Sequence, residues 1–66
     1  MWVVVYVAPN RKVAMYLKQL LEVEGILVKL KEARLSENED RNVEVMVSEI
    51  EIEEANEVIN NALQRP

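Results

Sequence analysis

The stretch VEVMVSEIEIEEANEVINNAL, residues 43–63, changes from the spacing of a β-strand to that of an α-helix within a few positions. Its first three valines alternate with other residues, which is typical of a strand with one buried face. After Ser48, apolar residues recur at helical spacing. Ser48 and Glu51 have the spacing of a capping box, in which the serine hydroxyl accepts from a helix N–H and the carboxylate reaches back. The stretch therefore predicts a strand that leads directly into a helix capped by Ser48.

The N-terminal part of the chain predicts a further strand and helix. Residues 2–7 are β-branched or aromatic, which favours a strand. Pro9 blocks its extension, and Asn10 is a favourable N-cap for a helix that begins at Arg11. Gly25, the only glycine in the chain, follows the last helical apolar residues, where a left-handed C-cap is expected.

Two segments connect these regions. Residues 26–31 alternate between apolar and more polar side chains and predict another strand. Residues 33–42 are polar and without periodicity, so we interpret them as a long hairpin connection. The element order is then strand, helix, strand, strand, helix in a single domain, residues 1–66.

This order predicts the α+β class and a split βαβ, two-layer sandwich. The last strand would lie between the other two in an antiparallel sheet, with both helices on one face. We expect the core face of the sheet to carry Val3, Val5, Val7, Ile26, Val28, Leu30, Val43, Val45 and Val47. The first strand would be an open edge. The outer face would carry Trp2, Val4, Tyr6, Leu27 and Met46, a set apolar enough to indicate an interface.

The size of the chain also favours self-association. A domain of 66 residues buries only about 60% of the surface that its unfolded chain exposes, so its core is marginal. The chain has no cysteine, which excludes a disulfide. We therefore expect a homo-oligomer, with a dimer favoured and a trimer open, or a contact with another protein.

The charge pattern bears on other partners. The net charge is −4, with +3 on residues 1–35 and −7 on residues 36–66. An acidic chain is poorly suited to nucleic acid, because phosphate neutralisation supplies most of the non-specific affinity. The apolar N-terminal run stops at Pro9, far short of the ~20 residues of a membrane span. We expect no nucleic-acid or membrane partner and a cytoplasmic location.

Catalytic chemistry has little support in the sequence. Cysteine and histidine are both absent, and they are the usual nucleophile, base and zinc ligands. The clustered carboxylates are more simply explained as solvated charge. We expect no catalytic residues, no metal site and no cofactor.

An anion site is the alternative binding hypothesis. The N-terminus of a helix favours anions, and the connection between the second and third strands should lie at the same end of the sheet. The candidate ligands for a phosphate or nucleotide are Asn10, Arg11, Lys12, Arg34 and Arg41.

Three features together resemble a known family. They are Ala8-Pro9-Asn10 after an N-terminal strand, a helix that ends in LEVEGI at residues 21–26, and a valine-rich strand that enters an acidic helix. This pattern resembles a family of very small bacterial proteins classed as signal transducers of unknown function, with a PII-like, ferredoxin-like core. The resemblance implies that fold and a regulatory role. The chain departs from the family in having Ser48-Glu49-Ile50 where a proline is usual, and its ten-residue polar connection has no glycine-rich cradle for phosphates.

The sequence thus predicts a non-catalytic regulatory or protein-interaction module. The alternative is a sensor of a small molecule or anion, similar to PII-type signal transducers.

Overall fold

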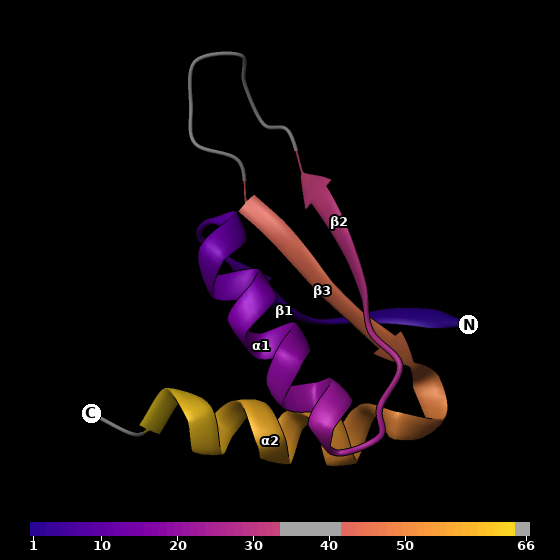
Figure 1. Cartoon of the computed structure of the whole chain (residues 1–66). Helices are drawn as coiled ribbons and strands as arrows, with labels where there is room; N and C mark the ends of the chain where they lie inside the picture. Colours follow the sequence, from indigo (N-terminus) through magenta and orange to yellow (C-terminus); the bar gives the residue numbers. More distant parts are fainter. Residues whose placement is uncertain (34–41, 65–66) are drawn as a thin grey trace.

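The structure is a computed structural model that describes residues 1–33 and 42–64. Along the chain it contains β1 (Trp2–Ala8), α1 (Arg11–Val23), β2 (Lys29–Ala33), β3 (Asn42–Ser48), the short 3₁₀ turn η1 (Glu49–Glu51) and α2 (Ile52–Gln64) (Figure 1). The predicted element order is confirmed.

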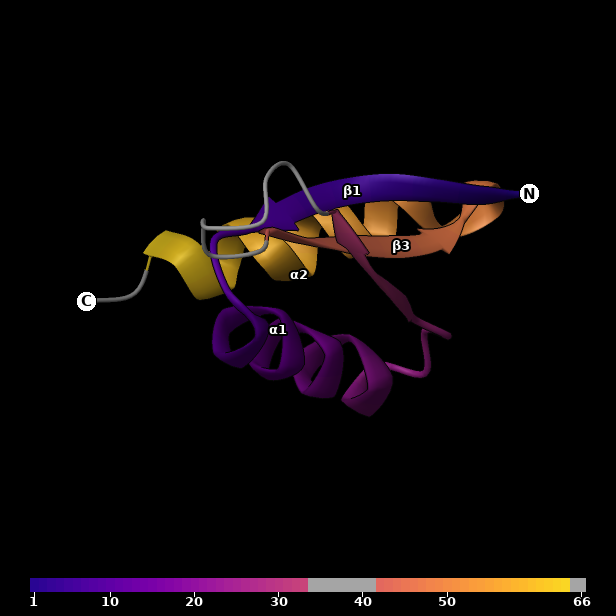
Figure 2. The ribbon, with the colours of Figure 1, turned by 90° about the horizontal axis from the view of Figure 1, so that it is seen from above.

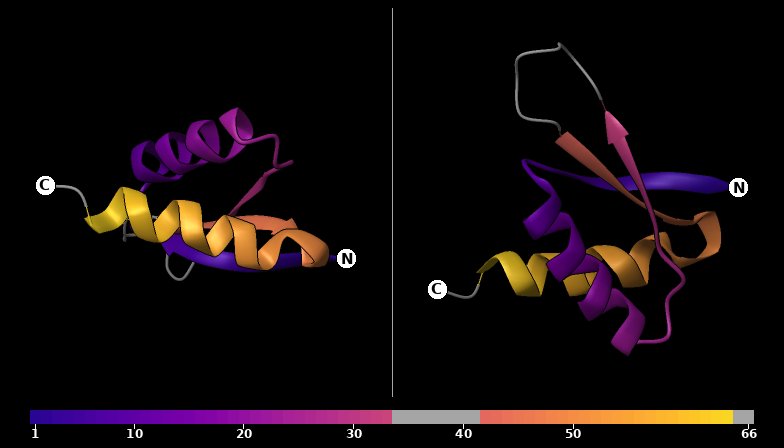
Figure 3. Two further views of the ribbon diagram at one scale, coloured as in Figure 1. Left: turned by 90° about the horizontal axis from the view of Figure 1, so that it is seen from below. Right: turned by 45° about the horizontal axis from the view of Figure 1, so that its top comes forward.

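The three strands form one antiparallel sheet in the order β1-β3-β2, as the split βαβ hypothesis requires. The two helices contact each other and cover the same face of the sheet (Figures 2 and 3). The molecule is therefore an α+β two-layer sandwich, and the other face of the sheet is covered by no helix within the described residues.

The core lies between the sheet and the two helices. Its buried members come from both helices, from one face of β3, from the last residue of β1 and from the turn after α1. They are Ala8, Ala14, Leu17, Leu21, Ile26, Val43, Val45, Val47, Ala55 and Ile59. All are apolar, and no polar or charged side chain in the described residues is buried. The predicted alternation of β3, with Val43, Val45 and Val47 buried, is thus confirmed.

A β-bulge in β1 corrects the predicted faces of that strand. Val3 lies opposite Val47, but the register shifts between Val4 and Tyr6. Because a bulge inserts one extra residue, the alternation of side chains is inverted beyond it. Tyr6 consequently packs against the core, and Val7 is 48% exposed. The expectation of Val7 in the core and Tyr6 on the outer face was wrong.

The second strand begins later than expected. Gly25 adopts a left-handed φ of 84°, as predicted, and the turn directs Ile26 into the core. Leu27 precedes β2 and is 73% exposed. At the other end, Ala33 pairs with Asn42, so both residues belong to strands and the hairpin connection is shorter than expected. Residues 34–41 lie outside the described part of the chain.

The two helix starts differ from each other. The Asn10 side chain accepts a hydrogen bond of 2.9 Å from the Val13 N–H, so the predicted cap of α1 is confirmed. Ser48 makes no side-chain capping bond, and η1 precedes α2. Ser48 is still paired with Trp2, and the Glu49 N–H donates to the Met1 carbonyl at 3.0 Å. The capping box was wrong because the backbone remains attached to β1 at the position where the cap was expected.

Candidate interaction surface

The outer face of the sheet combines apolar side chains with a few charges. Side chains of directly paired residues lie on the same face of an antiparallel sheet. Met46 is paired with Val4 on one side and Lys29 on the other, so these three form a row across the sheet. Val7, Glu44 and Lys31 form the next row. We call Trp2 and these six residues the outer-face patch.

Trp2 is the largest side chain of the outer-face patch. It is 42% exposed, and the Lys29 ammonium lies 5.6 Å from the centre of its ring. This is cation–π geometry. The lysine comes from β2 and the tryptophan from β1, at opposite edges of the sheet. The contact therefore spans the width of the patch over the central strand.

The structure brings together three of the five predicted interface residues. Trp2, Val4 and Met46 share the outer face, whereas Tyr6 packs against the core and Leu27 lies outside the strand. The structure adds Val7, which sequence reasoning had placed in the core. No signal in the sequence marks the bulge that reverses these two positions, because residues 2–7 are apolar at every position.

Two of the five predicted anion ligands, Asn10 and Arg11, contact groups of the protein itself. The Asn10 carboxamide oxygen caps α1. The Arg11 guanidinium lies 3.7 Å from the Glu32 carboxylate, while Lys12 is exposed. Arg34 and Arg41 lie outside the described residues. The glutamate beside Arg11 opposes an anion at this helix start, since it contributes a like charge.

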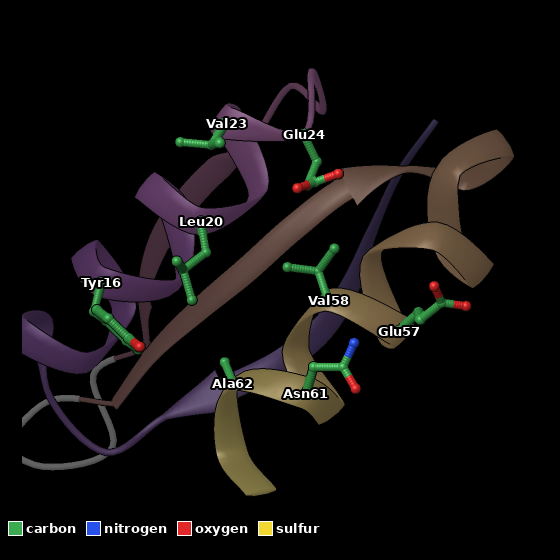
Figure 4. A pocket seen from close by; sticks show the side chains of 8 residues that line it. All are labelled: Tyr16, Leu20, Val23, Glu24, Glu57, Val58, Asn61 and Ala62. Carbon is green, nitrogen blue, oxygen red and sulfur yellow. The ribbon is translucent and has the colours of Figure 1, made fainter. Parts of the chain in front are cut away.

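A groove of about 290 Å³ lies between the two helices (Figure 4). Its lining comes from both helices and consists of Tyr16, Leu20, Val23, Glu24, Glu57, Val58, Asn61 and Ala62. Sequence reasoning missed the groove because it exists only where two separate helices pack together. A weak signal was present: Tyr16 and Val23 are large apolar residues outside the buried stripe of α1.

The remaining charged groups lie at the surface. The ion pairs Lys18–Glu22, at 3.1 Å, and Met1 amino group–Glu49, at 3.8 Å, are both partly or largely exposed. Among residues 1–33 and 42–64, no group of three or more His, Cys, Asp or Glu side chains is placed to hold a metal ion. In the same ranges, no helix combines the length and apolar character needed to span a membrane.

Comparison with known proteins returns no match to a family model, to a curated protein or to a solved structure.

Proposed function

We propose that the chain is a non-catalytic interaction module that binds a second copy of itself through the outer-face patch. The observation that carries this proposal is the patch itself, where Trp2, Val4, Val7 and Met46 lie on a sheet face that no described element covers. Aromatic residues and methionine are enriched where proteins contact each other. A domain of this size also gains stability from burying such a face.

Charge complementarity favours a second copy as the occupant. Lys31 lies directly across from Glu44 on the outer face, and Lys29 is in the neighbouring row. In a two-fold contact each patch meets the same patch. The Glu44 carboxylate of each copy can then approach Lys29 or Lys31 of the other copy. The apolar residues of the two copies would meet in the same contact.

The face of the sheet is better suited to this contact than its edge. β1 is an edge strand, and edge strands often pair with other chains. However, the bulge at Val5 interrupts the strand in its middle, and bulges bend an edge away from regular pairing. We therefore place the contact on the outer-face patch.

The size of the patch indicates a weak, reversible dimer. The three strands have seven, five and seven residues. With a rise of ~3.3 Å per residue and a spacing of ~4.8 Å between strands, they present a footprint of roughly 300 Å². Stable complexes bury about 800 Å² per partner. We expect a dissociation constant on the order of 100 μM, in the range of transient regulatory contacts.

An anion or nucleotide sensor is the alternative function. Its described ligands would be Asn10, Arg11 and Lys12, and the first two already bind groups of the protein itself. The Glu32 carboxylate next to Arg11 further lowers the attraction for an anion. These contacts are the reason that we place the binding function on the sheet.

Sedimentation equilibrium over protein concentrations from about 10 μM to 1 mM tests the dimer, since this range brackets the expected dissociation constant. The wild type should shift from monomer to dimer mass. Trp2→Glu combined with Val4→Lys should remain monomeric throughout, because both changes place charge in the apolar part of the patch.

Ile50→Glu is the matched control. Ile50 is among the most exposed apolar residues and lies in η1, outside the patch. This variant should dimerise like the wild type. A wild type that is monomeric at every concentration, or a Trp2→Glu/Val4→Lys variant that dimerises equally well, would contradict the proposal.

A further inference from the structure

The groove between α1 and α2 is a second surface with its own chemistry, on the helical layer of the sandwich. Leu20, Val58 and Ala62 are only partly exposed and form its apolar base. Tyr16 and Val23 of α1 stand at its rim and are 52% and 81% exposed. Figure 4 shows Leu20 and Val58 pointing toward one another across the groove.

One end of the groove is acidic. Glu24 is the C-cap residue of α1, and Glu57 lies on α2; both line the groove and both are exposed. Within the described residues, neither carboxylate forms an ion pair, whereas the nearby Glu22 is paired with Lys18. The C-terminal end of α1 adds the negative end of its dipole next to Glu24. A cation at this end would therefore be attracted by two carboxylates and by the helix terminus.

We propose that this groove binds a segment of a partner protein in which an apolar side chain lies next to a lysine or arginine. The apolar side chain would rest on Leu20 and Val58, and the cation would reach Glu24 and Glu57. Lysine and arginine suit this arrangement because their aliphatic stems cover apolar surface while the charged group stays near water.

The shape of the groove favours a protein segment over a free small molecule. Sites for small ligands enclose most of the ligand, typically 70–90% of its surface, in pockets of about 300–1,000 Å³. This groove, at about 290 Å³, lies just below that range, and the strong exposure of Val23 leaves its rim open. A peptide that extends along both helices gains contacts beyond the groove that a small amine lacks.

A titration followed by amide chemical shifts in NMR tests the proposal. The probe is the acetylated and amidated peptide Leu-Lys-Leu-Leu-Lys-Leu, and its counterpart with glutamate in place of both lysines is the charge control. We expect shift changes concentrated at Tyr16, Leu20, Glu24, Glu57 and Asn61 with the lysine peptide only. Shift changes elsewhere, or equal binding of the glutamate peptide, would overturn the proposal.

Two double variants separate the groove from general charge attraction. Glu24→Gln combined with Glu57→Gln should weaken binding of the lysine peptide roughly three- to tenfold, as expected for two exposed ion pairs. Glu53→Gln combined with Glu54→Gln makes the same change in net charge on exposed residues of α2 that do not line the groove. It should change binding less than about twofold. Equal weakening by the two double variants would overturn the proposal.

Two further titrations complete the test. The first identifies the kind of molecule that occupies the groove, and the second separates groove binding from self-association. Spermidine, a free polyamine, should bind the groove more weakly than the lysine peptide; equal or tighter binding would overturn the choice of a protein segment. The titration should be unchanged in the Trp2→Glu/Val4→Lys variant, because the outer-face patch lies on the other layer. Loss of peptide binding in that variant would contradict the assignment to the groove, whether or not the chain dimerises.

Discussion

At the scale of single residues, two positions with similar sequence signals have different roles. Asn10 and Ser48 both stand before a helix and both are favourable cap residues. Asn10 follows Pro9, where the chain has left the sheet, so its side chain is free to bind the helix. Ser48 is the last residue of β3 and is still paired with β1. Whether a favourable N-cap residue forms its capping hydrogen bond therefore depends on whether the adjacent backbone has left the sheet.

Replacement of these two residues by alanine should have unequal effects on stability. Asn10→Ala removes the bond to the Val13 N–H and should lower the free energy of unfolding by about 1 kcal/mol. In a domain of this size, that loss lowers the melting temperature by roughly 4–8 °C. Ser48→Ala removes no capping bond and should change the free energy of unfolding by less than about 0.5 kcal/mol. Thermal unfolding followed by circular dichroism measures the melting temperatures of both variants. A larger decrease in melting temperature for Ser48→Ala than for Asn10→Ala would contradict the cap assignment.

At the scale of the element, the bulge in β1 determines which residues the strand gives to each face. Before the bulge, Val3 faces the core opposite Val47; after it, Ala8 faces the core opposite Val43. Without the extra residue, Val7 would lie on the core side and Ala8 on the outer side. The bulge thus places a small residue in the core where α1 begins, and it adds Val7 to the outer-face patch.

Alanine substitutions at the two reversed positions test the bulge. Tyr6→Ala removes a ring packed against the core and should cost about 2–3 kcal/mol, somewhat below the usual cost for a fully buried aromatic residue. Val7→Ala removes an exposed side chain and should cost less than about 1 kcal/mol. Urea denaturation at low protein concentration gives both values. If the strand had no bulge, Val7→Ala would lower the free energy of unfolding more than Tyr6→Ala.

At the scale of the whole molecule, the proposed self-association would be linked to the stability of the domain. A domain of 66 residues is expected to have a free energy of unfolding of roughly 3–10 kcal/mol. In the part of the chain that the structure describes, the helices cover only one face of the sheet. A second copy that binds the folded state shifts the unfolding equilibrium further toward that state. The proposed dimer, even a weak one, would therefore add measurably to the stability of this protein.

The melting temperature of the wild type should accordingly rise with protein concentration. Between about 10 μM and 1 mM, a dissociation constant near 100 μM implies a gain of roughly 1 kcal/mol or less, and hence a few degrees. The Trp2→Glu/Val4→Lys variant should melt at the same temperature at every concentration. Differential scanning calorimetry measures the melting temperatures of both proteins. A wild type whose melting temperature does not change with protein concentration would argue against self-association.

The amino-acid sequence by itself determined the order and kinds of the elements, the strand order of the sheet and the cap at Asn10. The elements and the cap depend on local signals: helical or alternating spacing, one glycine with a left-handed φ, and a proline that ends a strand. The strand order follows from the order of these elements through the handedness rule for a strand–helix–strand connection. Such signals act over a few neighbouring residues, so they can be read along the chain. Of the predicted patch, Trp2, Val4 and Met46 followed from the same alternation.

Only the tertiary structure decided the faces of Tyr6 and Val7, the lost cap at Ser48 and the groove between the helices. Each depends on a partner distant in sequence: β3 sets the register that creates the bulge, Met1 binds Glu49, and α2 closes the groove on α1. In an all-apolar strand such as residues 2–7, one register is not distinguished from the next by side-chain polarity. The choice between registers is made when the sheet and helices pack together, because only then does the core exclude one of the two faces.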